Sequence, residues 1–133
     1  MPSLKSPGGS MYPYYYKNGE LFGVHFGSFF DNEEGLLALM KAEEEFMKKQ
    51  NCQLPLWIDF YETKLTDRIL IEFLHSMNRL HHQIPKLAIV GCSWKDQWRI
   101  KRFRKKLELE LPVLVKYFSD PEEAKTWLVS ETF

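Results

Sequence analysis

The sequence carries no excess of charge of either sign. Its 18 lysine and arginine residues are balanced by 18 aspartate and glutamate residues over a length of 133 residues. A chain without net charge produces no long-range field that draws in nucleic acid or anionic lipid. Attraction of that kind would need a local cluster of cations, so we do not expect nucleic acid as a partner of the chain as a whole.

Long apolar runs are also missing. No stretch approaches the roughly 18 apolar residues that span a bilayer, so we expect no transmembrane segment. The first ten residues lack the hydrophobic core of a secretion signal. The two cysteines, Cys52 and Cys92, have neither the spacing of a metal site nor that of a redox pair. We therefore predict a cytoplasmic protein with free thiols, no metal and no cofactor.

Catalytic motifs are scarce. The four histidines have no companions at metal-ligand spacing, and the seven glycines are scattered and form no phosphate-binding loop. The segment GCSWK at residues 91–95 lacks the final glycine of a nucleophile elbow. Asp59, Cys92 and Ser93 are expected near one another at strand ends, and this polar cluster is the candidate site for an enzyme. The sequence nevertheless favours a non-catalytic protein.

Aromatic residues, by contrast, are abundant. Ten Phe, six Tyr and four Trp make up 15% of the chain. The length is that of one domain, to which we assign residues 11–133. Residues 1–10 hold mainly proline, glycine and serine, and we interpret them as a flexible tail.

The domain begins with a predicted hairpin. Asn18-Gly19, a strong turn signal, separates an aromatic strand at residues 11–16 from a second strand at residues 21–30. The even positions of the second strand are apolar, whereas His25 stands between two glycines on its odd face. Either a backbone packs closely on that thin face, or a gap with His25 in it remains there.

A helix is predicted to follow the hairpin and to run to about residue 49. Asp31 and Asn32 are residue types that cap helices. Glu43 falls in the middle of the apolar side of this helix. A carboxylate at such a position needs a partner or a route to water, and we expect Glu43 to reach water at the rim of the core.

Three further strands alternate with three further helices. The predicted strands cover residues 54–60, 86–90 and 111–118, and the predicted helices cover residues 66–80, 94–107 and 121–129. The whole order, β-β-α-β-α-β-α-β-α, predicts an α/β fold with a mixed, largely parallel five-stranded sheet and four helices. Partners and ligands of such sheets usually meet the loops at the carboxyl ends of the strands.

The segment WIDFYETKLTDRIL at residues 57–70 carries a more specific signal. A strand that ends in Asp59 leads through a short loop to a helix that starts near Asp67. This pattern, the order of the elements and the closing segment FSDPEEAKTWL resemble STAS domains, the anti-sigma-factor antagonists. The resemblance covers about residues 11–130 and implies a SpoIIAA-like fold of the STAS/SEC14 type.

The resemblance also implies a regulatory or protein-interaction module rather than an enzyme. It places partner binding on the loop and helix that comprise Lys64, Thr66, Asp67, Arg68 and Glu72. The family's phosphorylated serine falls on Ile69, which has no hydroxyl, so the phosphorylation switch is expected to be absent. Thr66 is the nearest hydroxyl, and we predict that it caps the helix.

The predicted helix at residues 94–107 combines tryptophans with cations. On a helical wheel its two tryptophans fall nearly opposite the apolar stripe. The members of this predicted patch are Trp94, Trp98, Lys101, Arg102 and Lys105. Two interpretations stay open: the patch binds an anionic partner, or the helix starts later and the tryptophans cover the edge of the sheet.

A second function stays open beside protein interaction. The aromatic surplus and a looser likeness to lipid-exchange domains fit a small carrier of lipid or of another hydrophobic ligand. That hypothesis predicts an apolar cavity beside the sheet in contact with His25, Phe26 and Met40. We also consider pairing of the aromatic hairpin, residues 11–30, with a second copy of the chain, which would make a homodimer.

Overall fold

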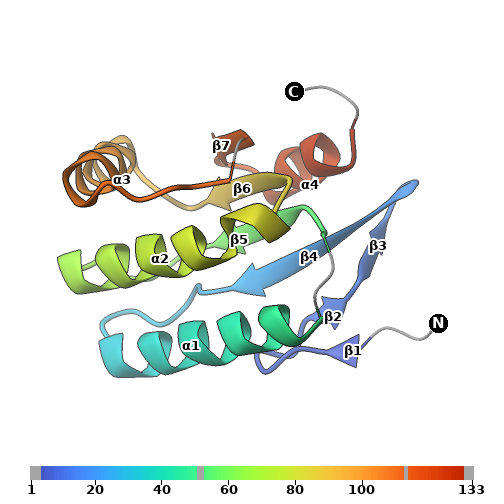
Figure 1. Cartoon of the computed structure of the whole chain (residues 1–133), viewed down its shortest axis with the longest axis horizontal. Helices are drawn as coiled ribbons and strands as arrows, with labels where there is room; N and C mark the ends of the chain where they lie inside the picture. Colours follow the sequence, from blue (N-terminus) through green and yellow to red (C-terminus); the bar gives the residue numbers. More distant parts are fainter. Residues whose placement is uncertain (1–3, 51–52, 113, 131–133) are drawn as a thin grey trace.

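The computed structural model describes residues 4–50, 53–112 and 114–130. Its main sheet has five strands in the order β3-β4-β5-β6-β7, with β3 and β4 antiparallel and the other neighbours parallel (Figure 1). These strands are β3 (Tyr14–Tyr16), β4 (Gly19–His25), β5 (Leu56–Asp59), β6 (Lys86–Val90) and β7 (Leu114–Phe118).

Four helices accompany the sheet. They are α1 (Glu33–Gln50), α2 (Asp67–Leu80), α3 (Trp94–Leu107) and α4 (Pro121–Val129). The predicted α/β architecture is therefore confirmed. A second, two-stranded sheet of β1 (Leu4–Lys5) and β2 (Met11–Tyr12) was not predicted.

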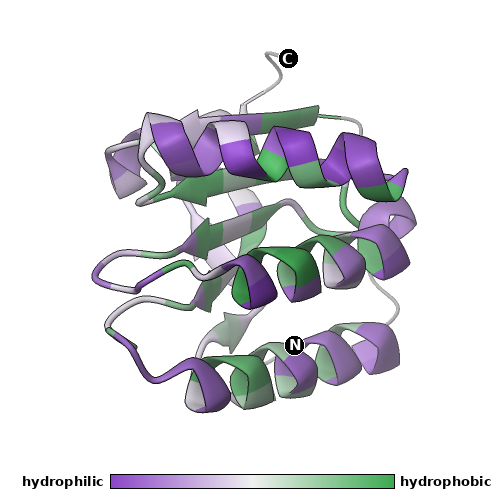
Figure 2. Cartoon of the chain, turned by 90° about the vertical axis from the view of Figure 1, so that its left-hand side faces the viewer, coloured by the Kyte–Doolittle hydropathy of each residue, from purple (hydrophilic) through white to green (hydrophobic). Residues whose placement is uncertain are grey.

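Helices α1, α2 and α3 cover one face of the main sheet and stand side by side in front of it in Figure 2. The even positions of β4, Phe22, Val24 and Phe26, are buried against this layer. Each fully buried side chain of this size contributes about 1.5–3 kcal/mol relative to an exposed one. The alternation of apolar residues in the sequence thus predicted correctly which face of β4 is buried.

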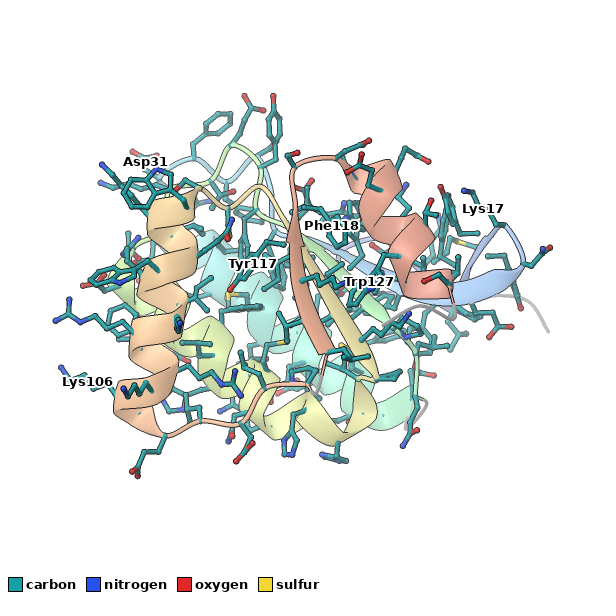
Figure 3. All side chains as sticks on the ribbon, turned by 90° about the horizontal axis from the view of Figure 1, so that it is seen from above. Lys17, Asp31, Lys106, Tyr117, Phe118 and Trp127 are labelled. Carbon is teal, nitrogen blue, oxygen red and sulfur yellow. The ribbon has the colours of Figure 1, made fainter. Side chains whose placement is uncertain are left out.

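Helix α4 covers the other face alone. Its Trp127 lies beside Phe118 of β7, with ring centroids 5.7 Å apart (Figure 3). Lys86 of β6 is buried and donates hydrogen bonds to the carbonyl oxygens of Trp127 and Ser130 at 3.0 and 2.8 Å. The lysine thus adds a charged donor at the negative end of α4, where the Trp127 carbonyl also accepts the Ser130 N–H at 3.2 Å.

The thin face of β4 is covered by a side chain. The ring of Trp57 in β5 lies so close to Gly23 that a Cβ atom there would meet the ring carbon Cε3 at 2.7 Å. The ring of His25 packs edge-on against the same indole at 4.9 Å. Trp57 therefore fills the space that the glycine leaves open.

The predicted hairpin is shorter and more broken than expected. Pro13, which has no N–H to donate, separates β2 from β3. The return strand ends at His25, and residues 26–30 follow it as a loop. In that loop Ser28 and Phe30 have φ angles of 62° and 52°, which a continuing strand does not allow.

Within the tail predicted at residues 1–10, residues 4–10 form strand β1 and a hydrogen-bonded turn, whereas residues 1–3 lie outside the described residues. The Ser6 N–H donates to the Ser10 carbonyl at 2.8 Å, which closes a compact turn between β1 and β2. Ser6 and Ser10 are both buried. Proline, glycine and serine suit tight turns as well as mobile tails, so composition did not distinguish the two.

This turn lies over helix α1 and buries Glu43. The Gly8 N–H donates to Glu43 Oε1 at 3.0 Å, and Glu43 is only 2% exposed. The expectation that Glu43 reaches water at the rim is therefore wrong. Burial raises the pKa of this carboxyl, although hydrogen bonds from Gly8 and Ser6 oppose the shift.

The neighbouring carboxylate, Glu44, joins α1 to α2. It accepts hydrogen bonds from Ser76 Oγ at 2.7 Å, from Arg79 Nε at 2.6 Å and from Arg79 Nη2 at 2.8 Å. Lys48 Nζ lies 3.0 Å from Glu44 Oε2. Burial alone would raise the pKa of Glu44, but these partners outweigh it and lower the pKa to about 2.

We expect Glu44→Gln to lower the free energy of unfolding at pH 7 by about 2 kcal/mol, because the charge-assisted bonds are lost. The pKa of Glu44 in the folded state lies below its usual value of 4.5. Its stabilisation is therefore present above about pH 4.5 and is lost as the pH falls toward 2. Urea unfolding between pH 3 and pH 7 should show the variant and the native chain converging on acidification. Glu45→Gln, at an exposed neighbour, is the control, and parallel pH profiles for Glu44→Gln and the native chain would contradict the assignment.

Candidate functional site

Two loops run side by side at the carboxyl ends of β4 and β5. The Ser28 N–H donates to the Tyr61 carbonyl at 2.6 Å, and the Phe30 N–H donates to the Glu62 carbonyl at 2.9 Å. The Lys64 N–H donates back to the Phe30 carbonyl at 2.7 Å. The two loops thus continue the pairing of β4 with β5. Their hydrogen bonds fix the backbone conformation at this edge of the sheet.

The first two turns of α1, α2 and α3 are connected at this same edge. Arg68 of α2 lies 2.6 Å from the carboxylate of Glu34 in α1. Asp67 of α2 lies 2.6 Å from Arg99 in α3, and Arg99 also donates to the Leu65 carbonyl at 2.7 Å. We call this row of ion pairs the helix-start ladder. It fixes the three helices relative to one another where the loops end.

Thr66 is the cap of α2, as predicted. Its Oγ accepts a hydrogen bond from the Ile69 N–H at 3.2 Å and donates one to Glu33 of α1. Ile69, the position that matches the family's phosphorylated serine, is only 1% exposed. The position therefore lacks a hydroxyl and also points into the core.

The structure brings together the other residues of the predicted partner surface at the start of α2. Lys64, Asp67, Arg68 and Glu72 are exposed. Asp67 and Arg68 belong to the helix-start ladder, so their charges are already paired with other helices. Their placement agrees with a surface role but does not by itself single out a partner.

Each member of the predicted polar cluster has its own local contacts. Asp59 Oδ1 accepts the Tyr61 N–H at 2.8 Å, and Ser93 caps α3 by accepting the Asp96 N–H at 3.2 Å. Burial, with a contribution from Asp96, raises the pKa of the Cys92 thiol to about 12. A thiol with that pKa is a poor nucleophile at neutral pH. Each member thus has a separate local role.

The tryptophans of α3 are exposed, which excludes the interpretation in which they cover the edge of the sheet, while binding of an anionic partner stays a prediction. Trp94 is 74% exposed and Trp98 is 56% exposed, whereas Ile100 is buried in the core. Lys95 lies 5.8 Å from the ring of Trp94, and Arg102 lies 5.5 Å from the ring of Trp98. Lys101 and Lys105, the other predicted patch residues, are exposed as well.

Two further aromatic residues at this edge were not singled out from the sequence. Phe30 and Tyr61, in the paired loops, are each 60% exposed. Tyr61 had a usable signal, because it comes directly after the predicted strand at residues 54–60, whereas Phe30 had none, because it was predicted to lie inside the strand at residues 21–30. We call Phe30, Tyr61, Trp94 and Trp98 the edge aromatics. In Figure 3 this edge includes Asp31, whereas Lys106 lies at the far end of α3.

The apolar cavity predicted beside the sheet is not there. The space between Phe26, Met40 and their neighbours amounts to about 10 Å³, which is no more than one water molecule needs. Side chains of α1 and α2 fill the space between these helices and the sheet. His25 lies on the opposite face, in a groove beside Trp57 and Lys125.

The described residues give no sign of a metal centre or a membrane span. They contain no group of three or more His, Cys, Asp or Glu side chains placed to hold a metal ion. Within the same residues, no helix combines the length and the hydrophobicity that crossing a bilayer requires. The pairing of residues 11–30 with a second copy stays a prediction.

Comparison with known proteins identifies the fold. No family model and no curated protein matches the sequence. Among solved structures, the chain is similar to an uncharacterised protein of the DUF3478 family from Shewanella loihica, described as having a SpoIIAA-like fold. The TM-score is 0.52 at 14% identity, over 87% of this chain and 90% of that one. The SpoIIAA-like fold implied by the sequence is confirmed, and a likeness at this identity shows the fold alone.

We expect Thr66→Ala to lower the free energy of unfolding by about 1 kcal/mol, because the helix N–H groups and Glu33 lose their hydroxyl partner. Thr66→Ser keeps the hydroxyl and should retain most of the native stability. Chemical denaturation of the three proteins at pH 7 measures both effects. Equal stability of the alanine variant and the native chain would show that Thr66 is not a structural cap.

Proposed function

We propose that this chain is a non-catalytic interaction module that binds a protein partner through the edge aromatics. The observation that carries the proposal is the exposure of four large aromatic side chains at one edge, each by more than half. Aromatic residues of this kind dominate the binding energy of protein interfaces. The SpoIIAA-like fold supports a regulatory role by analogy only.

The charges around the edge aromatics favour a protein over a membrane. Around Trp94 and Trp98, α3 presents exposed cations that suit acidic side chains of a partner. Directly beside Phe30 and Tyr61 in the chain, the exposed charged residues are Asp31 and Glu62, and the exposed cation Lys64 follows in the same pair of loops. Those carboxylates would repel an anionic bilayer, whereas a protein surface can match both halves of the edge. We therefore infer a partner with apolar anchors and an acidic region facing α3.

The proposed binding is constitutive. Ile69 offers no hydroxyl to modify and is buried. Asp67 already places a negative charge in the first turn of α2 and is held by Arg99. The first turn of α2 thus carries a permanent negative charge where the switch would bring a reversible one. A cytoplasmic location accompanies the proposal and is supported by Cys92, a free thiol.

Site-specific photo-crosslinking in the native host tests the proposal. A photoreactive p-benzoylphenylalanine replaces Tyr61 or Trp94, which keeps an aromatic ring at each position. The matched control replaces His82, which is exposed at the amino ends of the strands. We expect one and the same partner to be captured from positions 61 and 94 and not from position 82.

The captured partner is then purified and its affinity measured by calorimetry. We expect Trp94→Ala to weaken binding at least tenfold, the loss typical of an aromatic at the centre of an interface. Equal capture from all three positions, or an unchanged affinity of Trp94→Ala, would overturn the proposal.

A further inference from the structure

A further surface lies along one side of the main sheet, where strand β7 ends the strand order. Within the described residues only β6 pairs with β7, and no other hydrogen bond reaches the β7 backbone. An edge strand of this kind presents a row of N–H and C=O groups to which another strand can bond. In Figure 3, β7 lies between α3 and α4, and neither helix crosses it. We call the unpaired side of β7 the β7 edge.

The two edges of the main sheet differ in how they are protected. At the opposite edge, β3 has only three residues, follows Pro13 and is joined to α4 by the hydrogen bond from Tyr16 to Glu122. Strand β7 has five residues, LVKYF, with no proline and a single charge, and it pairs with β6 without a bulge. Natural sheets usually blunt an exposed edge with proline, charges or bulges. A longer and mainly apolar edge is therefore suited to pairing with another chain.

The β7 edge opens into a groove on the side of α3. The groove has a volume of about 390 Å³, and its lining includes Trp98, Lys101, Arg104, Val115 and Tyr117. Val115 and Tyr117 belong to β7 and are half-buried against the core under α1, α2 and α3. Figure 3 shows Tyr117 on the α3 side of the strand. An added strand would therefore extend an apolar surface that β7 leaves partly open.

The charge along the β7 edge is positive. Lys101 and Arg104 are exposed in the groove on one side of the strand, and Lys116 is exposed on the other. None of these three cations forms an ion pair within the described residues. Glu110 precedes β7 in the chain and Asp120 follows it, but neither lines the groove. Cations on both sides of an edge strand suit an added strand that carries carboxylates.

The same charges disfavour a second copy of this chain at the β7 edge. Lys116 is the central residue of β7. In a twofold antiparallel pair, the register that joins all residues of the two strands places Lys116 directly opposite its own copy. Like charges directly opposite each other on paired strands are destabilising. The edge therefore favours a different chain with acidic side chains over self-association.

We propose that β7 receives an extended acidic segment of a partner protein as an additional strand of the main sheet. Backbone hydrogen bonds to the β7 edge hold the segment, and its side chains alternate between the α3 side and the α4 side. Its carboxylates meet Lys101 and Arg104 on one side and Lys116 on the other. The site meets the edge aromatics only at Trp98, and it takes a separate segment from the partner surface proposed there.

Fluorescence anisotropy of the full chain with a short labelled peptide that alternates glutamate and valine tests the class of partner. The matched control peptide carries lysine in place of glutamate. We expect a Kd of about 10–500 μM for the acidic peptide and binding of the basic peptide that is weaker by about tenfold or more. Equal binding of the two peptides, or no binding of the acidic peptide up to about 2 mM, would overturn the proposal.

Amide hydrogen exchange, measured by nitrogen-15 NMR, tests whether the acidic peptide pairs with β7. We expect the β7 amides that point away from β6 to exchange rapidly in the free protein and about tenfold or more slowly in the complex, with the amides of β3 unchanged. Binding that leaves the β7 amides unprotected would contradict strand addition. A dimer of the free protein with these amides already protected would show that a second copy occupies the edge, which would also overturn the proposal.

Charge reversals locate the binding. Lys101→Glu and Arg104→Glu each reverse one cation of the groove, and we expect each to weaken binding of the acidic peptide by about fivefold. Arg104→Glu should in turn bind the basic peptide more tightly than the native chain does, which a merely misfolded variant would not. The control is Lys106→Glu, which makes the same charge change at an exposed position of α3 outside the groove (Figure 3). An equal loss in Lys106→Glu and Arg104→Glu would contradict the site.

Discussion

The indole of Trp57 fits against strand β4 only because residue 23 has no side chain. A Cβ atom at that position would lie 2.7 Å from the ring, a separation that real Cβ atoms essentially never show. The indole in turn sets the ring of His25 at 4.9 Å and the cation of Lys125 at 5.4 Å. One glycine thus determines the packing on the α4 face and the shape of the groove there. Trp57 also belongs to the smaller core cluster on this face, where it packs with Leu21 and Ala88.

At the carboxyl edge of the sheet, large aromatic side chains face solvent instead of packing against the strands. There the backbone loops are hydrogen-bonded to each other and three helices are joined through ion pairs, while large aromatic side chains project outward. The exposed ion pairs contribute little to stability one by one. Their effect is geometric, because they hold the loops and helix ends that present the aromatics. A surface arranged in advance in this way loses less entropy on binding.

The order of the elements could be predicted from the sequence because its signals are local. Thr66 caps the helix that follows it, as predicted, and Ser93 and Asp120 are residues of the same capping type that cap α3 and α4. The burial of Glu43 could not be predicted in this way. It depends on the turn at residues 6–10, which lies more than thirty residues away in the chain and resembles a mobile tail in composition.

The functional surfaces were less accessible to sequence reasoning than the fold. A helical wheel placed Trp94 and Trp98 opposite the apolar stripe, but only the packing of α3 through Ile100 shows which side faces solvent. The groove beside Trp57 lies on the thin face of β4, where the glycines around His25 left a gap as one of two interpretations. Only the structure shows that the indole of Trp57 packs on Gly23 there.

The most direct test of the central claim is hydrogen exchange of the four tryptophan indole N–H groups, measured by nitrogen-15 NMR on the free protein at low concentration. If the edge aromatics form an open docking surface, the indoles of Trp94 and Trp98 exchange at nearly unprotected rates, while those of Trp57 and Trp127 exchange more slowly. Protection of Trp94 and Trp98 equal to that of Trp57 would mean that this surface is covered. The proposed mode of binding would then be contradicted.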